Sequence, residues 1–154
     1  MDVMKDGQKA LRLLQDYVKD HPISLETLDI ELKLAKTNET LVRNYDEALR
    51  AYQRIIDTRQ NDVVVHEAYY RIGFVYRDGF ANYTEAVKSW QTLIDEYYNN
   101  DFSDQAQFAM AYTYEAYIRD YTRARAAYND FLNRYPNSQL QNDVRNAILR
   151  IARK

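Results

Sequence analysis

Apolar positions along the chain recur in a pattern with a 38-residue period. The clearest copy begins at Asn82 and Tyr83 and continues through Ala86 and Trp90 to Ile94. Its apolar residues fall three or four positions apart, which is the spacing of one face of an α-helix. The chain is therefore an internal repeat of helical units. The four copies are Ala10, Leu14, Tyr17 and Val18; Ala48, Tyr52, Ile55 and Ile56; Ala86, Trp90, Leu93 and Ile94; and Ala124, Tyr128, Phe131 and Leu132.

Residues that can cap helix N-termini form two series with the same 38-residue step. Their side-chain oxygens can accept hydrogen bonds from the free N–H groups of a first helical turn. Glu47, Glu85 and Gln141 each stand three residues after a cap, which is the spacing of a reciprocal capping box. The caps are Asp6, Asn44, Asn82 and Asp120 in one series and Ser24, Asp62, Asn100 and Ser138 in the other. They predict eight helices, at about 7–19, 24–39, 45–59, 63–78, 83–97, 102–118, 121–134 and 139–153.

The predicted helices alternate between two types, which we name B and A, starting with B. Each B helix carries an alanine followed four residues later by a larger residue, so a small position lies next to a large one. The A helices have their small residue at Ala35, Gly73 and Ala111. Leu149 breaks this series, as expected for a terminal A helix with no following pair to pack against.

The composition supports helix nearly throughout. The 154 residues include only 3 Gly and 2 Pro, and both prolines, Pro22 and Pro136, stand two residues before a serine cap. The absence of cysteine excludes disulfides, thiolate metal sites and thiol nucleophiles. No apolar run approaches the roughly 20 residues of a membrane helix, and no signal peptide is visible. We therefore expect a cytosolic chain, or one whose targeting segment has been removed from this sequence.

These residues together resemble the tetratricopeptide repeat family. Its motif has Leu-Gly and an aromatic in helix A, then Tyr, Ala, a bulky aromatic and a terminal Pro in helix B. The matching positions are Ile72, Gly73, Tyr76, Tyr83, Ala86, Trp90, Pro22 and Pro136. The resemblance covers essentially the whole chain. It implies an all-α fold, an α-solenoid of antiparallel helix hairpins that forms a right-handed superhelix.

The resemblance also implies one domain over residues 1–154. It would contain a B helix at 7–19, hairpins at 24–59, 63–97 and 102–134, and a terminal helix at 139–153. Because the array begins on a B helix without its A partner, we expect a segment of a longer protein. The usual repeat has about 34 residues, so about four extra residues should lie in longer helices and in turns such as Arg77–Asn82 and Tyr97–Asp101.

One run, from Ala126 to Ser138, is similar to repeats of bacterial cell-envelope members of the family. This similarity implies the periplasm or cell envelope, with the cytoplasm as the alternative. Arg77-Asp78-Gly79 and Trp90 are also similar to Sel1-like repeats, but the strict period favours the first family.

Family geometry implies that the A helices line a concave wall and that a ladder of their residues faces a peptide-binding groove. Its central part is aromatic, and exposed rings rimmed by charge are typical of a docking groove. The alternative is that Tyr70 and Phe108 pack into the core. The Lys-Asn-Arg clamp for chaperone tails is absent, because Glu67 and Tyr70 follow Lys36, so we expect an apolar or mixed peptide. The groove positions are Leu32, Lys36, Tyr70, Phe74, Arg77, Phe108, Tyr112, Glu115, Asn146 and Arg150.

Catalysis and metal binding have little support in the sequence. The only histidines, His21 and His66, have neither zinc-site nor triad spacing. The glycines form no phosphate loop. Residues 99–104 are rich in oxygen ligands but lack the glycine and distal glutamate of a calcium loop. We expect no enzyme activity, no cofactor and no metal.

The predicted function is therefore a non-catalytic scaffold or adaptor that binds a peptide or helix of a partner protein. The alternative is a structural or oligomerisation module of a larger cell-envelope assembly, with self-association through an apolar face near Leu11, Leu14 and Val18. A net charge of -2 gives no reason to expect nucleic acid. Residues 119–154 nevertheless hold 8 Lys and Arg against 3 Asp and Glu. This basic end could bind an acidic partner, or it could simply be a solvent-exposed end of the repeat array.

Overall fold

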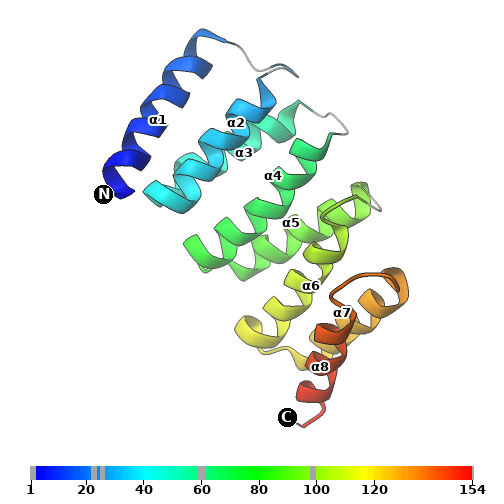
Figure 1. Cartoon of the computed structure of the whole chain (residues 1–154). Coiled ribbons are helices and arrows are strands. Elements are labelled where there is room, and N and C mark those ends of the chain that lie inside the picture. The colour runs from blue at the N-terminus through cyan, green and yellow to red at the C-terminus, as the bar shows by residue number, and fades with distance from the viewer. Residues whose placement is uncertain (1–2, 22–23, 25–26, 59–61, 98–99, 154) are drawn as a thin grey trace.

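The described part of the chain is a row of helices without strands. The structure is a computed structural model, and it describes residues 3–21, 24, 27–58, 62–97 and 100–153. Consecutive helices lie side by side along the row (Figure 1). The eight α-helices within these ranges are α1 (Val3–Asp20), α2 (Leu28–Thr37), α3 (Tyr45–Asp57), α4 (Val63–Phe74), α5 (Tyr83–Glu96), α6 (Ser103–Thr113), α7 (Tyr121–Arg134) and α8 (Gln141–Ile151).

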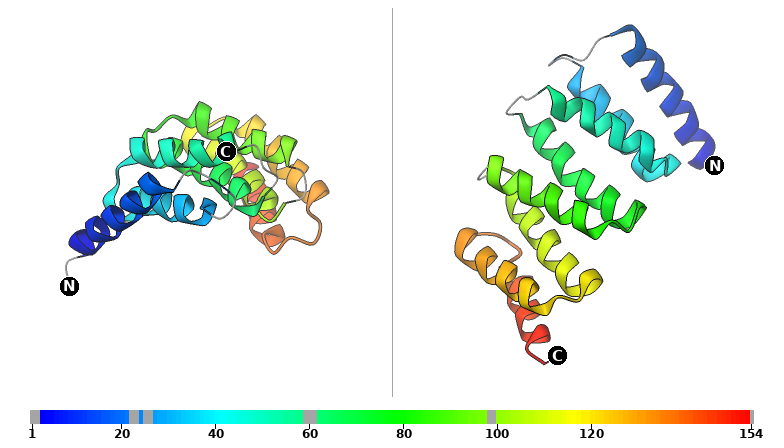
Figure 2. Two further views of the ribbon diagram at one scale, coloured as in Figure 1. Left: turned by 90° about the horizontal axis from the view of Figure 1, so that it is seen from above. Right: turned by 180° about the vertical axis from the view of Figure 1, so that it is seen from behind.

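The helices alternate between two layers, as the A and B types predict. The A helices α2, α4, α6 and α8 form the layer nearer the viewer in Figure 1, and α3 and α5 lie behind them. Viewed from above, the row is arched (Figure 2). This arrangement confirms the predicted all-α solenoid. No helix in the described ranges is long and apolar enough to cross a membrane.

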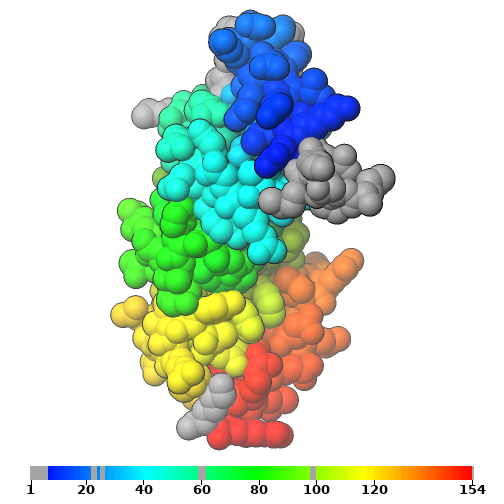
Figure 3. Space-filling view, turned by 90° about the vertical axis from the view of Figure 1, so that its left-hand side faces the viewer, coloured from blue at the N-terminus to red at the C-terminus, as the bar shows by residue number. Residues whose placement is uncertain are grey.

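Each of the first three A helices ends in a π-helical turn that the sequence pattern did not predict. These turns are η1 (Asn38–Val42), η2 (Val75–Gly79) and η3 (Tyr114–Ile118). The residue before each following cap has a left-handed backbone, with φ of 56° at Arg43, 51° at Ala81 and 62° at Arg119. These three positions follow the 38-residue period. In Figure 3 the cyan, green and yellow segments that contain the turns lie one above another.

Four of the eight predicted caps are confirmed at the start of a helix. Asn44, Asn82 and Asp120 accept from the N–H three residues later, and Asp62 accepts from Val64 at 2.8 Å. The reciprocal half of the capping box is not seen at Asn44 and Asn82. The N–H of Asn44 donates instead to the carbonyl of Asn38 at 2.8 Å, and that of Asn82 to the carbonyl of Tyr76 at 2.8 Å. The two glutamates at these boxes therefore pair with basic residues on their own helices.

The other four caps were placed wrongly. Asp6 lies inside α1, which begins at Val3. Ser24 belongs to a turn closed by Thr27, so α2 begins only at Leu28. Asn100 and Ser138 accept from the N–H two residues later and cap turns that precede α6 and α8. Pro22 lies outside the described residues.

Buried side chains form two clusters that meet at the middle of the row. One joins α2, α3 and α4, and the other joins α5 to α8. The large residues of the repeated B-helix position, Tyr52, Trp90 and Tyr128, are fully buried. Trp90 packs at Gly73, and Tyr52 and Tyr128 lie in the same buried clusters as Ala35 and Ala111, in agreement with the small-next-to-large pattern. Leu149 is 60% exposed, in agreement with its place on a terminal helix.

Candidate functional site

A cluster of hydrogen bonds joins the first two A helices on the A-helix face, the surface formed by α2, α4, α6 and α8. The hydroxyl of Tyr52 donates to the Glu39 carboxylate at 2.5 Å, and Arg71 on α4 donates to the same carboxylate at 3.3 Å. We call Glu39, Tyr52 and Arg71 the N-terminal latch. Burial, followed by the charge of Glu39, raises the pKa of Tyr52, so this phenol remains a donor.

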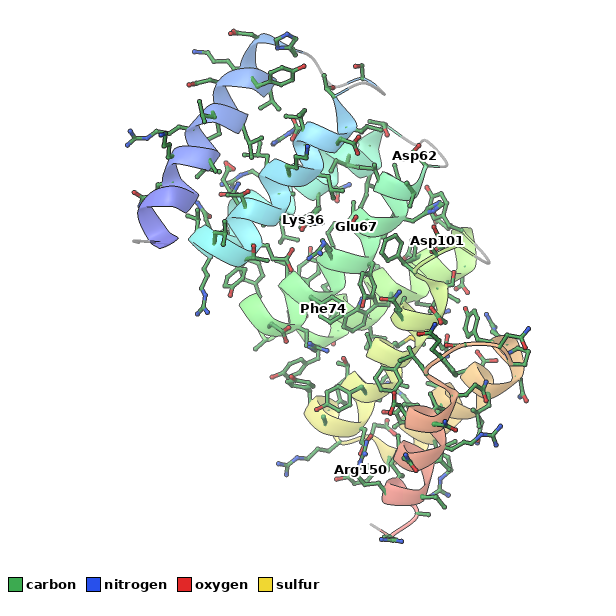
Figure 4. The ribbon with its side chains drawn as sticks, in the orientation of Figure 1. Lys36, Asp62, Glu67, Phe74, Asp101 and Arg150 are labelled. Atoms are coloured by element: carbon green, nitrogen blue, oxygen red, sulfur yellow. The ribbon has the colours of Figure 1, made fainter. Side chains whose placement is uncertain are left out.

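A second ion pair extends the N-terminal latch. Glu67 on α4 accepts from Lys36 on α2 at 2.9 Å and from Arg71 at 2.8 Å, and Figure 4 shows Lys36 and Glu67 pointing toward one another. Burial alone would raise the pKa of Glu67, but the hydrogen bonds and charges of Arg71 and Lys36 outweigh it and lower that pKa. The charged side chains at this junction therefore pair with one another within the protein.

The last two A helices are joined in the same way. Tyr128 donates to Glu115 at 3.0 Å, and Arg150 on α8 binds both carboxylate oxygens, at 2.6 and 2.7 Å. We call Glu115, Tyr128 and Arg150 the C-terminal latch. Bidentate pairing of arginine with a buried carboxylate fixes both geometry and position. Burial and Glu115 also raise the pKa of Tyr128.

The central repeat has a different set of residues at the positions of the latches. One period after Glu39 and one period before Glu115 stands Arg77, and the position of the two tyrosines is occupied by Trp90. The indole N–H donates to the carbonyl of Tyr70 at 2.9 Å. Gly73 replaces the alanine of the flanking repeats, because an added Cβ would lie 2.2 Å from the indole. The carboxylate latch is thus missing at the junction between α4 and α6.

Arg77 is held in place by aromatic rings and by its neighbour. Its guanidinium carbon lies 4.7 Å from the ring centre of Phe74 and 5.2 Å from that of Tyr117. Two of its nitrogens, Nε and Nη2, donate to Asp78 at 2.6 and 2.9 Å. Cation–π contacts of this kind fix a guanidinium beside apolar surface while it keeps its hydrogen-bonding edge.

A cleft of about 250 Å³ opens beside Arg77, between α4 and α6. We call it the central cleft. Figure 4 shows Phe74 where α4 approaches α6. The ring of Phe74 meets Tyr70 edge-on at 4.9 Å, and Tyr112 stacks near Phe108 at 6.5 Å with 38% of its surface exposed. The lining residues are Tyr70, Phe74, Arg77, Gln105, Phe108, Ala109, Tyr112 and Leu140.

The structure brings together five of the ten predicted groove residues in this cleft. Lys36, Glu115 and Arg150 lie in the two charged junctions, where each has an ion-pair partner. Leu32 is buried in the core of α2 and α3, and Asn146 is exposed on α8. The five cleft members are Tyr70, Phe74, Arg77, Phe108 and Tyr112.

Sequence reasoning missed three residues of the cleft and the reason for its position. Gln105, Ala109 and Leu140 lie outside the ladder of groove positions. The position of the cleft, however, had a signal in the repeat. Aligning the chain on its 38-residue period places Arg77 in register with Glu39 and Glu115, and this exchange marks the junction without a latch.

A wider hollow of about 350 Å³ lies between α3 and α5, away from these junctions. Its rim carries Arg50 and Lys88, which pair with Glu47 and Glu85 on their own helices. No group of three or more acidic or histidine side chains in the described ranges is arranged to hold a metal ion. The central cleft is therefore the better candidate for a binding site, because it combines clustered aromatic rings with Arg77, which has hydrogen-bond donors that the described part of the chain does not use.

The fold and site define an α-solenoid of stacked helical hairpins, a class of repeat scaffold. The family model of the tetratricopeptide repeat matches residues 67–99 and 105–138. Together with the helix hairpins, these two matches identify tetratricopeptide repeats in these two segments of the chain. A comparison with curated protein sequences found no match. The similarity to cell-envelope members stays a prediction.

The two matches begin one 38-residue period apart, in agreement with the repeat read from the sequence. Residues 100–104 lie between them, which agrees in part with the extra residues predicted near Tyr97–Asp101. The other predicted insertion, at Arg77–Asn82, falls inside the first match.

Proposed function

We propose that the protein is a non-catalytic adaptor that binds a segment of a partner protein on its A-helix face, with the central cleft as the main contact. The observation that carries this proposal is the difference among the three junctions between A helices. The first and last are joined by ion-paired latches, whereas the junction of α4 and α6 leaves clustered rings open.

The proposal follows from what each junction can offer a ligand. At the latches, a ligand would have to compete with hydrogen bonds that already satisfy buried carboxylates. At the central cleft, burial of apolar side chains on Phe74 and Tyr112 would be favourable at once. Partner residues outside the cleft would then run along the A-helix face, past Lys36 on one side and Asn146 on the other.

The experiment is selection of a random peptide display library on the purified protein. The selected peptides are then tested against Phe74→Ala/Tyr112→Ala and against Tyr17→Ala. Tyr17 is the matched control, because it is 41% exposed and lies on α1, outside the cleft. The double variant should lose binding and the control should keep it, while circular dichroism verifies that both are folded. Equal binding by all three proteins would show that the A-helix face was chosen wrongly.

The second candidate function is self-association through α1. The face predicted around Leu11, Leu14 and Val18 is half-buried, whereas Leu13 on the same helix is 64% exposed, near the exposed ring of Tyr17. Exposed apolar residues of this kind favour contact with another surface. Light scattering over a concentration series separates the two candidates, since a monomer at every concentration would argue against self-association and leave peptide binding unaffected.

A further inference from the structure

We propose that the central cleft accepts one large, uncharged apolar side chain of the partner, and that Arg77 positions this residue by donating a hydrogen bond to its main-chain carbonyl. The inference rests on the proposed function and narrows the chemistry of the ligand. It is carried by the size of the cleft, the charges around it and the free donors of Arg77.

The size of the cleft fits a side chain better than a small-molecule ligand. Its volume of about 250 Å³ is below the roughly 300–1,000 Å³ that is common for small-molecule sites. One wall consists of Tyr70 and Phe74, and the other of Phe108 and Tyr112. Flat rings on two sides favour an aromatic or a large aliphatic group, which would gain both buried area and ring contacts.

The charged groups near the cleft already have partners within the protein, which argues against a charged occupant. Arg77 is paired with Asp78 at its rim. Burial raises the pKa of the Tyr70 phenol, although the charges of Arg71 and Arg77 act to lower this pKa. Arg71 is itself paired with Glu39 and Glu67, and Asp104 accepts from the Ser138 hydroxyl. None of these charges is therefore left over to compensate the desolvation of a carboxylate or an ammonium group. An apolar group carries no such cost.

Arg77 has hydrogen-bond donors that the protein does not use. A guanidinium has five N–H groups. Asp78 occupies Nε and one edge of Nη2, and Nη1 makes no hydrogen bond to any residue in the described part of the chain. The side chain is only 12% exposed. A residue whose side chain enters the cleft brings its own carbonyl to the rim, and this neutral acceptor would satisfy Nη1 without disturbing the charge balance.

The ligand class can be tested with blocked single amino acids as probes. N-acetyl N-methylamides of tryptophan, leucine, aspartate and lysine are titrated into ¹⁵N-labelled protein, and backbone amide shifts are followed by NMR. The tryptophan and leucine probes should shift amides in 70–77 and 105–112, with little dependence on salt. The aspartate and lysine probes should leave these amides unchanged. Binding of either charged probe as tight as that of leucine would overturn the proposal.

The role of Arg77 is tested by comparing the tryptophan probe with 3-methylindole, which has the same ring system and no carbonyl. Wild type should bind the amide probe about tenfold more tightly. Arg77→Met keeps the length of the side chain and removes the donors, so this variant should bind the two probes alike and bind 3-methylindole as wild type does. An equal loss for both probes would mean that Arg77 is only part of the wall.

Two further results keep the proposals separable. Arg77→Lys retains a donor and should keep part of the preference for the amide probe, which covers the case in which the methionine variant does not fold. If no probe shifts the cleft amides while display-selected peptides still bind the A-helix face, the anchor proposal fails and the proposed function stands. If those peptides do not bind either, the proposed function itself fails.

Discussion

Replacing Gly73 with alanine should destabilise the protein, even though the same change favours a helix in most settings. Gly73 lies inside α4, and an added Cβ would be 2.2 Å from both Cε2 and Nε1 of Trp90. The indole cannot withdraw easily, because it is fully buried and donates to Tyr70. Alanine gains about 1 kcal/mol over glycine in a helix. Overpacking costs about 1–3 kcal/mol, and this severe overlap places the cost near the upper end. We therefore expect a net loss of about 2 kcal/mol.

The flanking repeats show how this loss can be reversed. At the same positions they carry alanine with tyrosine, and the tyrosine hydroxyl is satisfied by a glutamate. Trp90→Tyr together with Arg77→Glu would transfer that arrangement to the central repeat. In this background Gly73→Ala should cost nothing or stabilise by about 1 kcal/mol. The coupling free energy between the sites is then about 2–3 kcal/mol, near the upper end for residues in contact.

This double-mutant cycle is measured by unfolding each protein in urea and monitoring the loss of helix by circular dichroism. The four proteins are wild type, Gly73→Ala, Trp90→Tyr/Arg77→Glu and the combination. Gly7→Ala is the control in the same chain, because its Cβ would approach only Leu41, at 3.1 Å. It should cost less than Gly73→Ala. The reasoning is refuted if Gly73→Ala costs the same in both backgrounds, or if it costs nothing in wild type.

Three more changes test the capping, the ion pairs and the latches. Asn82→Ala removes the cap bond from the Glu85 N–H and should lower the free energy of unfolding by about 1 kcal/mol, whereas Asn133→Ala on an exposed face should have almost no effect in the same urea assay. The lowered pKa of Glu67 means that its stabilising contribution is present above its ordinary pKa of 4.5 and is lost as the pH falls through the folded value. Glu67→Gln should therefore be less stable at neutral pH and lose less stability on acidification, and a parallel acid loss in thermal melts would contradict this. Arg150→Ala leaves the buried carboxylate of Glu115 without its cation and should cost about 1–3 kcal/mol, and an unchanged unfolding midpoint would show that the C-terminal latch is not stabilising.

The fold could be predicted from the sequence because the repeat carries the packing rule in its residue types. An alanine and a large residue one turn apart recur in every B helix, and helices at that spacing can bury only one face. The π-turns could not be predicted in the same way. Their left-handed positions are Arg43, Ala81 and Arg119, none of which is the glycine that usually marks such a backbone.

The position of the central cleft could be predicted from the sequence, whereas the ion pairs on either side of it could not. The aromatic centre of the groove follows from the 38-residue period, which aligns Tyr70 with Phe108 and Phe74 with Tyr112. The role of Glu115 could not be read in this way, because its partner Arg150 lies 35 residues away and the pair exists only once α6 and α8 are adjacent. A carboxylate can be buried only when such contacts between helices pair it. A list of equivalent positions in successive repeats does not reveal these contacts.

The most direct test of the account is the affinity of a display-selected peptide for wild type and for the variant Gly73→Ala/Arg77→Glu/Trp90→Tyr, measured by isothermal titration calorimetry. This variant gives the central repeat the residues of its neighbours, so it should remain folded while the cation beside the cleft is replaced by a carboxylate. The account predicts that the peptide binds the folded variant at least about tenfold more weakly. Unchanged affinity would contradict the claim that the junction of α4 and α6 is the binding site.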